Sequence, residues 1–302
     1  MSLRAIVKAV GGDLYDRGRR ANIPAPGHSP KDRSVSLLLE AGRVIIHTFG
    51  AEDWRAARDS LRELGLIDDR GWLAPVAGRS CADAPPTLGA PERRLAARAH
   101  WEAARAITGT ASVRYCRSRN VKRDLPADTV LRHHPAAPLS AYRGGGATRP
   151  ALLAAISDPS GGFSAVEMTY LGPDGRRASD LRLPRKTIGP APGGCAIRLD
   201  AEAADMLVAE GVFTTLSATE RFGLPGWALM STRNLRAWSA PAGVRSVLIA
   251  ADRGKDGEAS AAILRDRLQA AGVAAAIALP PSPYGDWNEW SVGMARSAGR
   301  RG

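Results

Sequence analysis

The chain has 302 residues, of which 44% are hydrophobic and 24% are charged, so it can bury a core and is not globally disordered. At roughly 100–200 residues per domain, this length predicts two or three domains. The net charge of +12 favours a polyanionic partner, and three cysteines are too few for a disulfide framework. No apolar run reaches the about 18 residues that a membrane span needs. The N-terminal segment lacks a signal-peptide pattern, so we expect a cytoplasmic protein with no membrane partner.

The positive charge is unevenly distributed. Residues 76–202 contain 19 basic and 11 acidic residues, whereas residues 203–290 contain 8 and 9. A near-neutral block with acidic motifs after a basic block is expected if one part holds cations and another holds phosphates. A high-GC genome, which enriches Arg and Ala, is the alternative explanation for the basic composition.

Residues 1–75 predict a small β-rich domain. Apolar residues alternate with polar ones on two facing strands, as a half-buried hairpin requires; they are Val35, Leu37, Leu39, Val44, Ile46 and Phe49. Residues 76–92 are rich in Ala, Pro and Gly and are typical of a linker.

Residues 93–202 predict a basic α+β subdomain. Apolar spacing indicates a helix over 93–107, and a second, basic helix ends near Asn120. Short apolar runs then alternate with Gly and Pro, which is typical of strands joined by turns.

Residues 203–290 predict a parallel sheet flanked by helices, and residues 291–302 a basic tail. The expected strands are 206–209, 226–230, 246–251 and 273–279. Helical segments alternate with them at 214–222, 232–238 and 256–271, and this order implies right-handed crossovers between parallel strands. The fold class is therefore α/β in the C-terminal part.

Acidic residues follow three of these strands. Glu210 directly follows the first strand, Asp252 follows the third, and Asp286 and Glu289 follow the fourth. Because ligands of open parallel sheets bind at the carboxyl ends of strands, these acids predict one site. Carboxylate oxygens suit Mg²⁺ or Mn²⁺ held jointly with phosphates. The alternative is that the acids are solvated loop residues or helix caps.

The segments LVAEGVFTTLSATERFGLPGWALMSTRNL, VRSVLIAADRGKDGEASAAILRDRLQAAGV and PYGDWNEW together resemble the Toprim domain of primase-related proteins from phages, plasmids and integrated elements. Glu210 matches the Glu of the family's first motif, which implies a general acid/base or metal-linked role. Asp252 matches the first Asp of the metal-binding Asp-x-Asp motif, but Gly254 stands at the second position. Asp256 could act as a substitute ligand, and Asp286 matches the third acidic cluster.

The resemblance extends upstream to the basic half of bacterial primase cores, which contacts template and nucleotides. It implies phosphate contacts for Arg185 and Lys186, with Arg143 and Arg182 as further candidates. Arg suits bidentate phosphate contacts, and Lys acts as a point charge.

Residues 22–66 resemble a primase zinc-binding domain that has lost its ligands. His28 remains, but Ala25, Thr48 and Glu52 stand where cysteines are expected. We therefore expect no zinc, because a structural site needs four ligands, and we expect apolar packing in its place. The alternative is a replacement set of ligands made of His28, His47, Glu52 and Asp53. Nucleic-acid contacts from this domain would come from Lys31, Arg33 and Arg43.

The tryptophans carry a weaker signal. Trp54, Trp101 and Trp227 are expected in the core. Trp287 and Trp290 flank the third acidic motif, where they could stack on a base or pack.

The leading functional hypothesis is a primase-like nucleotidyltransferase of a phage or mobile element. It would make short primers on single-stranded DNA from nucleoside triphosphates, with Glu210 and Asp252 as catalytic groups and Mg²⁺ or Mn²⁺ as cofactor. A separate helicase would supply unwinding. Two alternatives remain: a nucleic-acid-binding protein with a degenerate metal site, and a metal-dependent Toprim nuclease.

Overall fold

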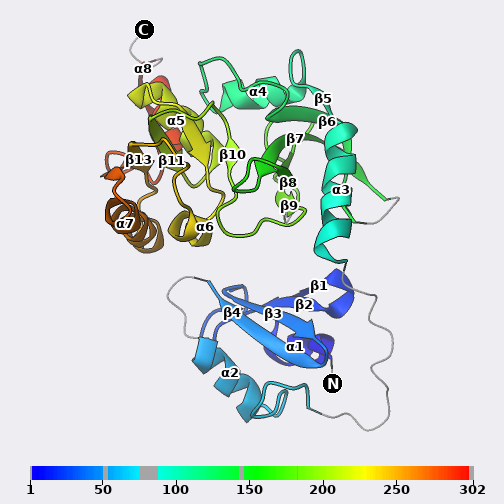
Figure 1. Cartoon of the computed structure of the whole chain (residues 1–302). Coiled ribbons are helices and arrows are strands. Elements are labelled where there is room, and N and C mark those ends of the chain that lie inside the picture. The colour runs from blue at the N-terminus through cyan, green and yellow to red at the C-terminus, as the bar shows by residue number, and fades with distance from the viewer. Residues whose placement is uncertain (1, 50–53, 75–87, 143–145, 182, 299–302) are drawn as a thin grey trace. The chain divides into compact units, whose positions relative to one another are not determined.

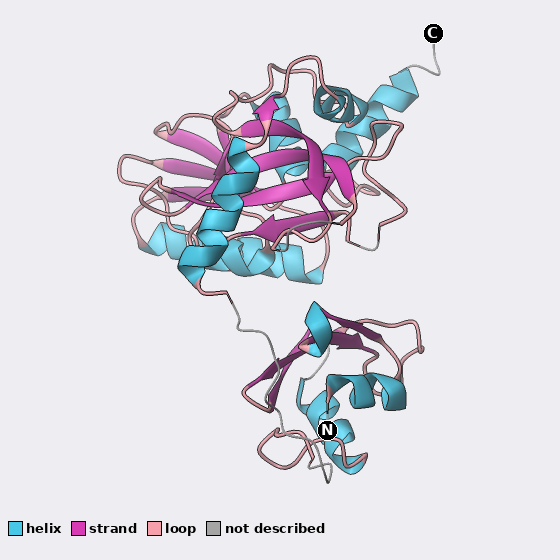
Figure 2. Cartoon of the chain, turned by 90° about the vertical axis from the view of Figure 1, so that its right-hand side faces the viewer, coloured by secondary structure: helices cyan, strands magenta, loops and turns pink. Residues whose placement is uncertain are grey.

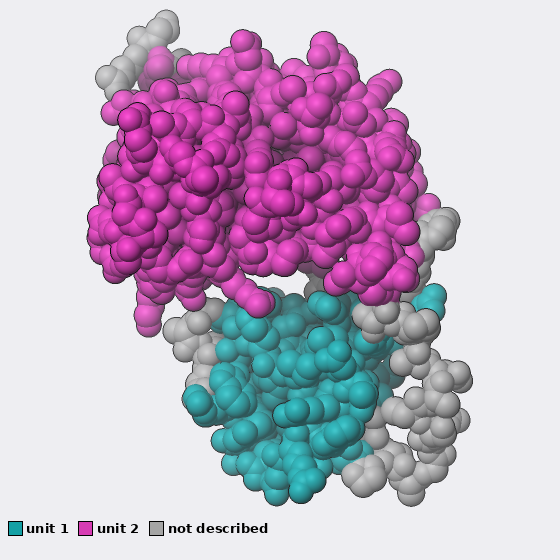
Figure 3. Space-filling model, viewed as in Figure 1, with its two compact units in different colours: residues 1–87 teal, residues 88–302 magenta. Residues whose placement is uncertain are grey.

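The structure is a computed structural model that describes residues 2–49, 54–74, 88–142, 146–181 and 183–298. It divides into two compact units, residues 1–87 and 88–302 (Figure 3). Each unit has its own hydrophobic core, and each is described by itself.

Unit 1 is a four-stranded antiparallel sheet with two helices. The strands follow one another in the order β1-β2-β3-β4. Both helices contribute buried side chains, including Ile6 and Leu61, to a core with Val35 and Leu37. The elements, most of them labelled in Figure 1, are α1 (Leu3–Val10), β1 (Asp13–Tyr15), the 3₁₀ helix η1 (Asp16–Gly18), β2 (Arg20–Ile23), β3 (Val35–Glu40), β4 (Arg43–Thr48) and α2 (Trp54–Glu63).

The β3–β4 hairpin has the expected alternation. Leu37 pairs with Ile46 and Leu39 with Val44, and all four side chains face the unit 1 core. Two expectations for the core are wrong. Phe49 lies beyond the end of β4 and is 52% exposed, and Trp54, at the start of α2, is 41% exposed.

Unit 2 begins with α3 (Ala90–Glu102) and a five-stranded antiparallel sheet. Figure 2 shows α3 lying across one face of a sheet of this unit, and buried Trp101 packs there with Met168 and Tyr170. The helix ends earlier than the sequence predicts, because Arg105 and Ala106 pair with a neighbouring strand. The strands, in sheet order, are β5 (Arg105–Ala106), β6 (Leu131–Pro138), β7 (Thr148–Ser157), β8 (Phe163–Tyr170) and β9 (Arg185–Ile188).

The other face of this antiparallel sheet packs against α4 (Ala111–Ser118) and against the C-terminal part of the unit. The core there joins Leu152 and Ile156 of β7 with Tyr115 of α4 and Val212 and Leu216 from beyond the sheet. The basic half of unit 2, residues 93–202, and the parallel-sheet half that follows it thus share one hydrophobic core.

The second sheet of unit 2 has the order β10-β12-β11-β13-β14. Strands β11 to β14 are mutually parallel, and β10 pairs antiparallel with β12. The expected parallel sheet is therefore confirmed. Its strands are β10 (Ile197–Arg198), β11 (Asp205–Ala209), β12 (Gly226–Ala228), β13 (Ser246–Ala250) and β14 (Ala274–Ala278).

Four helices cover this parallel sheet on both faces. The β11 residues Met206 and Val208 face the core shared with α6 and α7, whereas Leu207 and Ala209 face the core under α5 and α8. Continuous apolar strands are what a doubly covered sheet requires. The helices are α5 (Val212–Phe222), α6 (Thr232–Ala237), α7 (Lys255–Ala270) and α8 (Trp287–Ala298). Helix α8 thus continues past the sequence-based boundary at residue 290.

Trp287 and Trp290 pack at the start of α8. Trp287 is 5% exposed and meets Trp290 and Phe222 edge to face, with ring centroids 5.5 and 4.9 Å apart. The sequence left open whether Trp287 stacks on a base or packs inside the protein, and the structure shows that it packs.

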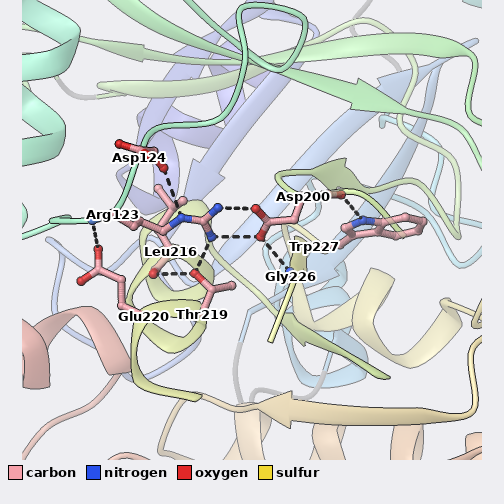
Figure 4. Close-up of polar contacts among 8 residues, drawn as sticks. All are labelled: Arg123, Asp124, Asp200, Leu216, Thr219, Glu220, Gly226 and Trp227. Carbon is pink, nitrogen blue, oxygen red and sulfur yellow. Dashed lines mark hydrogen bonds and ion pairs between the residues drawn. The ribbon is translucent and has the colours of Figure 1, made fainter. Parts of the chain in front are cut away.

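A polar network ties the loop after α4 to the parallel-sheet half (Figure 4). The Arg123 guanidinium pairs with Asp200 and donates to Thr219 Oγ1 on α5 at 2.7 Å. Glu220 accepts the backbone N–H of Arg123 at 2.9 Å. Asp200 in turn accepts the N–H of Gly226 at 2.9 Å, so one arginine links both halves.

Among the described residues, no helix is both long and apolar enough to cross a membrane.

Candidate active site

The parallel sheet has a switch point between β11 and β13. From β11 the chain moves through α5 to β12 on one side, and then through α6 to β13 on the other. The loops leaving the carboxyl ends of β11 and β13 therefore diverge, and ligands of such sheets bind in the gap between them. Glu210 directly follows β11, and Asp252 lies two residues after β13.

Asp252 is the most perturbed carboxyl group at this edge. Its Oδ1 atom is buried and has no hydrogen-bond partner among the residues that the structure describes. The pKa of Asp252 is raised to about 7, chiefly by burial and also by the nearby carboxylates of Glu210, Asp286 and Glu289, while Arg185 opposes the shift. A buried, unpartnered carboxylate oxygen among like charges is costly unless a cation or a proton neutralises it.

Glu210 belongs to the same group of charges. Burial raises the pKa of Glu210, Arg185 lowers it, and Asp256 raises it. The backbone carbonyl of Glu210 accepts the N–H of Met230 at 2.7 Å, which fixes the chain at the end of β11. The two acids at the switch point are thus electrostatically coupled, as the strand order predicts.

The third acidic motif is held by the start of α8. Asp286 Oδ1 accepts the N–H groups of Asn288 and Glu289 at 2.7 and 2.8 Å. Glu289 Oε2 accepts the N–H of Gly285 at 2.9 Å. Both acids are therefore helix caps, as the alternative interpretation proposed, and they also act on Asp252. The N–H of Arg253 donates to Gly285 O at 2.7 Å and joins the two acid-bearing loops.

Gly254 and Asp256 depart from the arrangement that a second metal-binding Asp would give. Gly254 has φ +120° and ψ 160°, a conformation that is essentially restricted to glycine. The Asp256 carboxylate pairs with Arg236 on α6. The structure therefore gives Asp256 a cationic partner instead of directing it to Asp252.

Gly257 shows how closely α7 approaches the site. A Cβ atom at residue 257 would lie 2.5 Å from Asp252 O, so glycine is required where the helix packs on this loop.

Arg185 and Lys186, adjacent on β9, have different surroundings. Arg185 is exposed, makes no hydrogen bond or ion pair with any described residue, and acts electrostatically on both Glu210 and Asp252. Lys186 Nζ donates to Leu139 O at 2.7 Å and lies 5.3 Å from the Tyr170 ring on the α3 face. Burial lowers the pKa of Lys186. The structure brings Arg185 to the acids but not Lys186, because neighbouring strand residues face opposite ways.

Sequence reasoning missed three residues near Arg185. Tyr115 on α4 is buried, burial raises its pKa, and the positive charges of Arg119, Arg177 and Arg185 lower it. Arg177 is exposed and has no ion pair among the described residues. Glu167 on β8 is buried, which raises its pKa, and Arg185 opposes that shift. Only the strand register, which puts Arg185 opposite Thr169 and beside Glu167, identifies this group.

Several predicted residues lie outside the described part of the chain. They are Arg143, Arg182, Glu52 and Asp53. Among the described residues, no three His, Cys, Asp or Glu side chains are already gathered to hold one metal ion.

The donor chemistry of the acidic edge nevertheless fits a divalent cation. Asp252 offers a buried oxygen without a partner, and Asp286 has only one of its oxygens in the helix cap. Hard carboxylate oxygens of this kind suit Mg²⁺ or Mn²⁺. The residues Glu210, Asp252 and Asp286 therefore fit such an ion by their chemistry.

Unit 1 carries a separate basic concavity of about 510 Å³. Arg43, Trp54, Arg58 and Arg70 contribute to its lining, and the Arg58 guanidinium lies 5.4 Å from the Trp54 ring. An exposed aromatic ring among guanidinium groups suits stacking on a nucleic-acid base. His28, the one remaining zinc-type ligand, has Nδ1 3.3 Å from Asp32 Oδ2.

Comparison with protein families decides the nature of the second half of unit 2. Residues 205–296 match the family model described as a Toprim domain. This part of the chain is a Toprim domain. Residues 91–199 match a domain of unknown function, DUF7146. No curated protein matches the chain significantly.

Solved primase structures are similar to the chain at low identity. The Aquifex aeolicus primase zinc-binding and RNA polymerase domains share 16% identity at a TM-score of 0.46, covering 100% of this chain and 82% of that one. The bacteriophage T7 primase fragment shares 13% identity at 0.39, covering 93% and 98%. A Pseudomonas aeruginosa DNA primase domain shares 16% identity at 0.43, covering 70% and 76%. Because these TM-scores lie below 0.5, the assignment depends on the Toprim match.

The Toprim match confirms the family resemblance and the α/β fold class expected for the C-terminal part. The zinc-binding resemblance of residues 22–66 stays a prediction.

Proposed function

We propose that the chain is a primase-type nucleotidyltransferase that joins nucleotides on single-stranded DNA, using nucleoside triphosphates and Mg²⁺ or Mn²⁺. One observation carries the proposal. The buried, unpartnered Asp252 Oδ1 lies among carboxylates at the Toprim switch point, and the uncommitted Arg185 of the basic half acts on the same group. Cation-binding and phosphate-binding chemistry therefore meet where phosphoryl transfer needs both.

The roles of the residues follow from their surroundings. Glu210, Asp252 and Asp286 would hold the ion, which when bound lowers the pKa of the attacking hydroxyl and neutralises charge on the leaving pyrophosphate. Glu210, whose pKa burial raises, would accept a proton on its carboxylate. Arg185 and Arg177 would take triphosphate oxygens, because neither guanidinium is paired within the described residues.

The proposal also divides the chain by task. Residues 1–75 would contact nucleic acid, 76–92 would link, 93–202 would bind phosphate, and 203–290 would hold the ion, with 291–302 as a basic extension. A cytoplasmic location, a phage or mobile-element source and a separate helicase are parts of the same proposal.

Labelled-nucleotide incorporation on single-stranded DNA tests the function directly. With Mg²⁺ or Mn²⁺, the wild-type chain should make short products, and Asp252→Ala and Glu210→Ala should reduce them by about 100-fold or more. Asp266→Asn, an exposed change on α7, is the matched control and should leave the rate unchanged. Absence of product from the wild-type chain on every template and with both ions would overturn the enzymatic proposal.

The second candidate is a non-catalytic nucleic-acid-binding protein. The specific observation in its favour is Gly254, which has no side chain and so leaves the second metal-binding position without a carboxylate. Its φ of +120° is a backbone conformation that favours glycine. Salt-sensitive binding of single-stranded DNA that is unaffected by Asp252→Ala, together with no incorporation, would support it. Nicking of supercoiled plasmid in Mg²⁺ would instead favour the third candidate, a Toprim nuclease.

A further inference from the structure

The end of α4 contacts the start of α8, although 169–171 residues separate the partners in sequence. Asn288 on α8 is 1% exposed. Its Oδ1 accepts from Arg119 Nε at 2.5 Å, and its Nδ2 donates to Arg119 O at 2.7 Å and to Ser217 Oγ on α5 at 2.9 Å. One buried amide therefore joins three helices.

Arg119 and Asn120 extend this contact to both sides. Asn120, in the left-handed conformation at φ +57°, donates through Nδ2 to Ser291 O and Ser291 Oγ at 2.9 and 2.8 Å. The Arg119 guanidinium lies 5.2 Å from the Phe213 ring, in the first turn of α5. The end of α4, from the basic half, thus contacts the helices that follow Glu210 and Asp286.

Asn288 is also bonded directly to the acidic edge. Its backbone N–H donates to Asp286 Oδ1 at 2.7 Å, and it lies between Asp286 and Glu289 in the chain. A shift of Asn288 would therefore move the carboxylate that it holds. Trp287 packs at the same end of α8, and the directional hydrogen bonds of Asn288 add a further constraint on the rotation of α8 about its axis.

We infer that Asn288, Arg119 and Ser217 form a positioning lock that sets the third acidic motif relative to Asp252 and to the basic half. The inference rests on the proposed function, because it assigns the lock to the proposed cation site. Asn288 is a positioning residue: its side-chain amide bonds to Arg119 and Ser217 and not to an acid, and it fixes the helix that presents Asp286.

The direct test is the affinity of the full chain for Mn²⁺, measured by titration of the free-ion electron paramagnetic resonance signal without nucleotide or DNA. Asn288→Ala should weaken binding by about 10-fold, because groups that orient a metal ligand carry effects of 10–100-fold. Ser217→Ala removes only one of the three hydrogen bonds and should weaken binding by about 2-fold, which keeps the test usable if Asn288→Ala does not fold.

Asn234 on α6 supplies a matched control. It is 8% exposed, its Nδ2 donates to Cys195 O and Leu229 O at 2.6 and 2.8 Å, and its Oδ1 accepts from Gly194 N at 2.7 Å. Asn234→Ala thus removes the same number of hydrogen bonds from a buried amide away from α8. It should lower the melting temperature as Asn288→Ala does but leave the Mn²⁺ affinity equal to that of the wild type, because no acid of the site bonds to it.

The outcomes separate the inference from the proposed function. If Asp252→Asn abolishes Mn²⁺ binding while folded Asn288→Ala and Ser217→Ala bind as tightly as wild type, the lock is wrong and the site stands. Equal weakening by Asn288→Ala and Asn234→Ala at equal loss of stability also overturns it. If the wild-type chain binds no Mn²⁺, the proposed cation site itself is wrong.

Discussion

The two regions that the sequence predicts to depart from primase motifs differ in what the structure places there. In unit 1, where zinc ligands are expected, buried aliphatic side chains such as Val35 and Leu37 make the core. At the Toprim edge, where one metal-binding Asp is missing, no apolar group has filled the place, and Asp252 keeps a buried oxygen without a partner. An apolar core is stable without a ligand, whereas a site for a charged ligand keeps a buried charge, and the free protein bears the free-energy cost of that charge.

The largest expected effect is on the stability of unit 1, which has an apolar core. Leu37 is fully buried on β3, so Leu37→Ala should lower the free energy of unfolding of unit 1 by about 2–5 kcal/mol. Leu64→Ala, at a 55% exposed position after α2, should change it by less than about 0.5 kcal/mol. Thermal unfolding with and without a chelator is the measurement. A wild-type unit 1 transition that falls on chelation would show that a metal, and not packing, stabilises it.

The second effect concerns Asp252 at the Toprim edge, where the free energy of unfolding should depend on pH. The folded pKa of Asp252 is about 7, above the unfolded value near 3.8, so the folded state binds this proton more tightly. Unfolding free energy in chelator should therefore fall as pH rises from about 4 to about 7. Asp252→Asn has no carboxyl group at this position, so its free energy of unfolding should not fall in this way. It should exceed that of the wild type by on the order of 2 kcal/mol at pH 8, with little difference at pH 4.

Urea denaturation at several pH values in chelator measures this difference. The exposed change Asp266→Asn on α7 should give a curve parallel to wild type. If the plots of unfolding free energy against pH for Asp252→Asn and wild type are parallel, the surroundings of Asp252 do not raise its pKa.

A third, smaller effect tests whether the missing Asp can be restored. Gly254→Asp forces an L-residue into φ +120°, ψ 160°, and should cost about 1–3 kcal/mol in stability without tightening Mn²⁺ binding. Gly272→Asp, at φ +79° with open space around its Cβ, is the control and should cost less. Tighter Mn²⁺ binding by Gly254→Asp at unchanged stability would contradict this account of the motif.

The smallest effect is expected at Asp256. Its carboxylate forms an exposed ion pair with Arg236, so Asp256→Asn should cost less than about 1 kcal/mol. Because that carboxylate is committed to Arg236, the Mn²⁺ affinity should change by less than about 3-fold, far below the effect of Asp252→Asn. A loss as large as that of Asp252→Asn would make Asp256 the substitute ligand that the sequence suggested.

The sequence by itself determined the Toprim sheet and the order of its acids. Short apolar runs such as 246–251, bounded by turn and helix signals, favour a doubly covered strand, and a carboxylate directly after such a run lies at the sheet edge. The alternation in β3 and β4 likewise fixed which side chains of unit 1 are buried, except at Phe49, where the strand had already ended.

Only the tertiary structure decided which charges are left unpaired. The sequence offers both Asp252 and Asp256 as metal ligands, yet Arg236 neutralises Asp256 and burial isolates Asp252. Arg185 and Lys186 are adjacent in the sequence, but they have different partners because they lie on opposite faces of β9. Asn288 bonds to Arg119, which lies 169 residues away in the chain. Local patterns specify strands and helices because those depend on neighbouring residues, whereas charge pairing depends on which distant segments the packed core brings together.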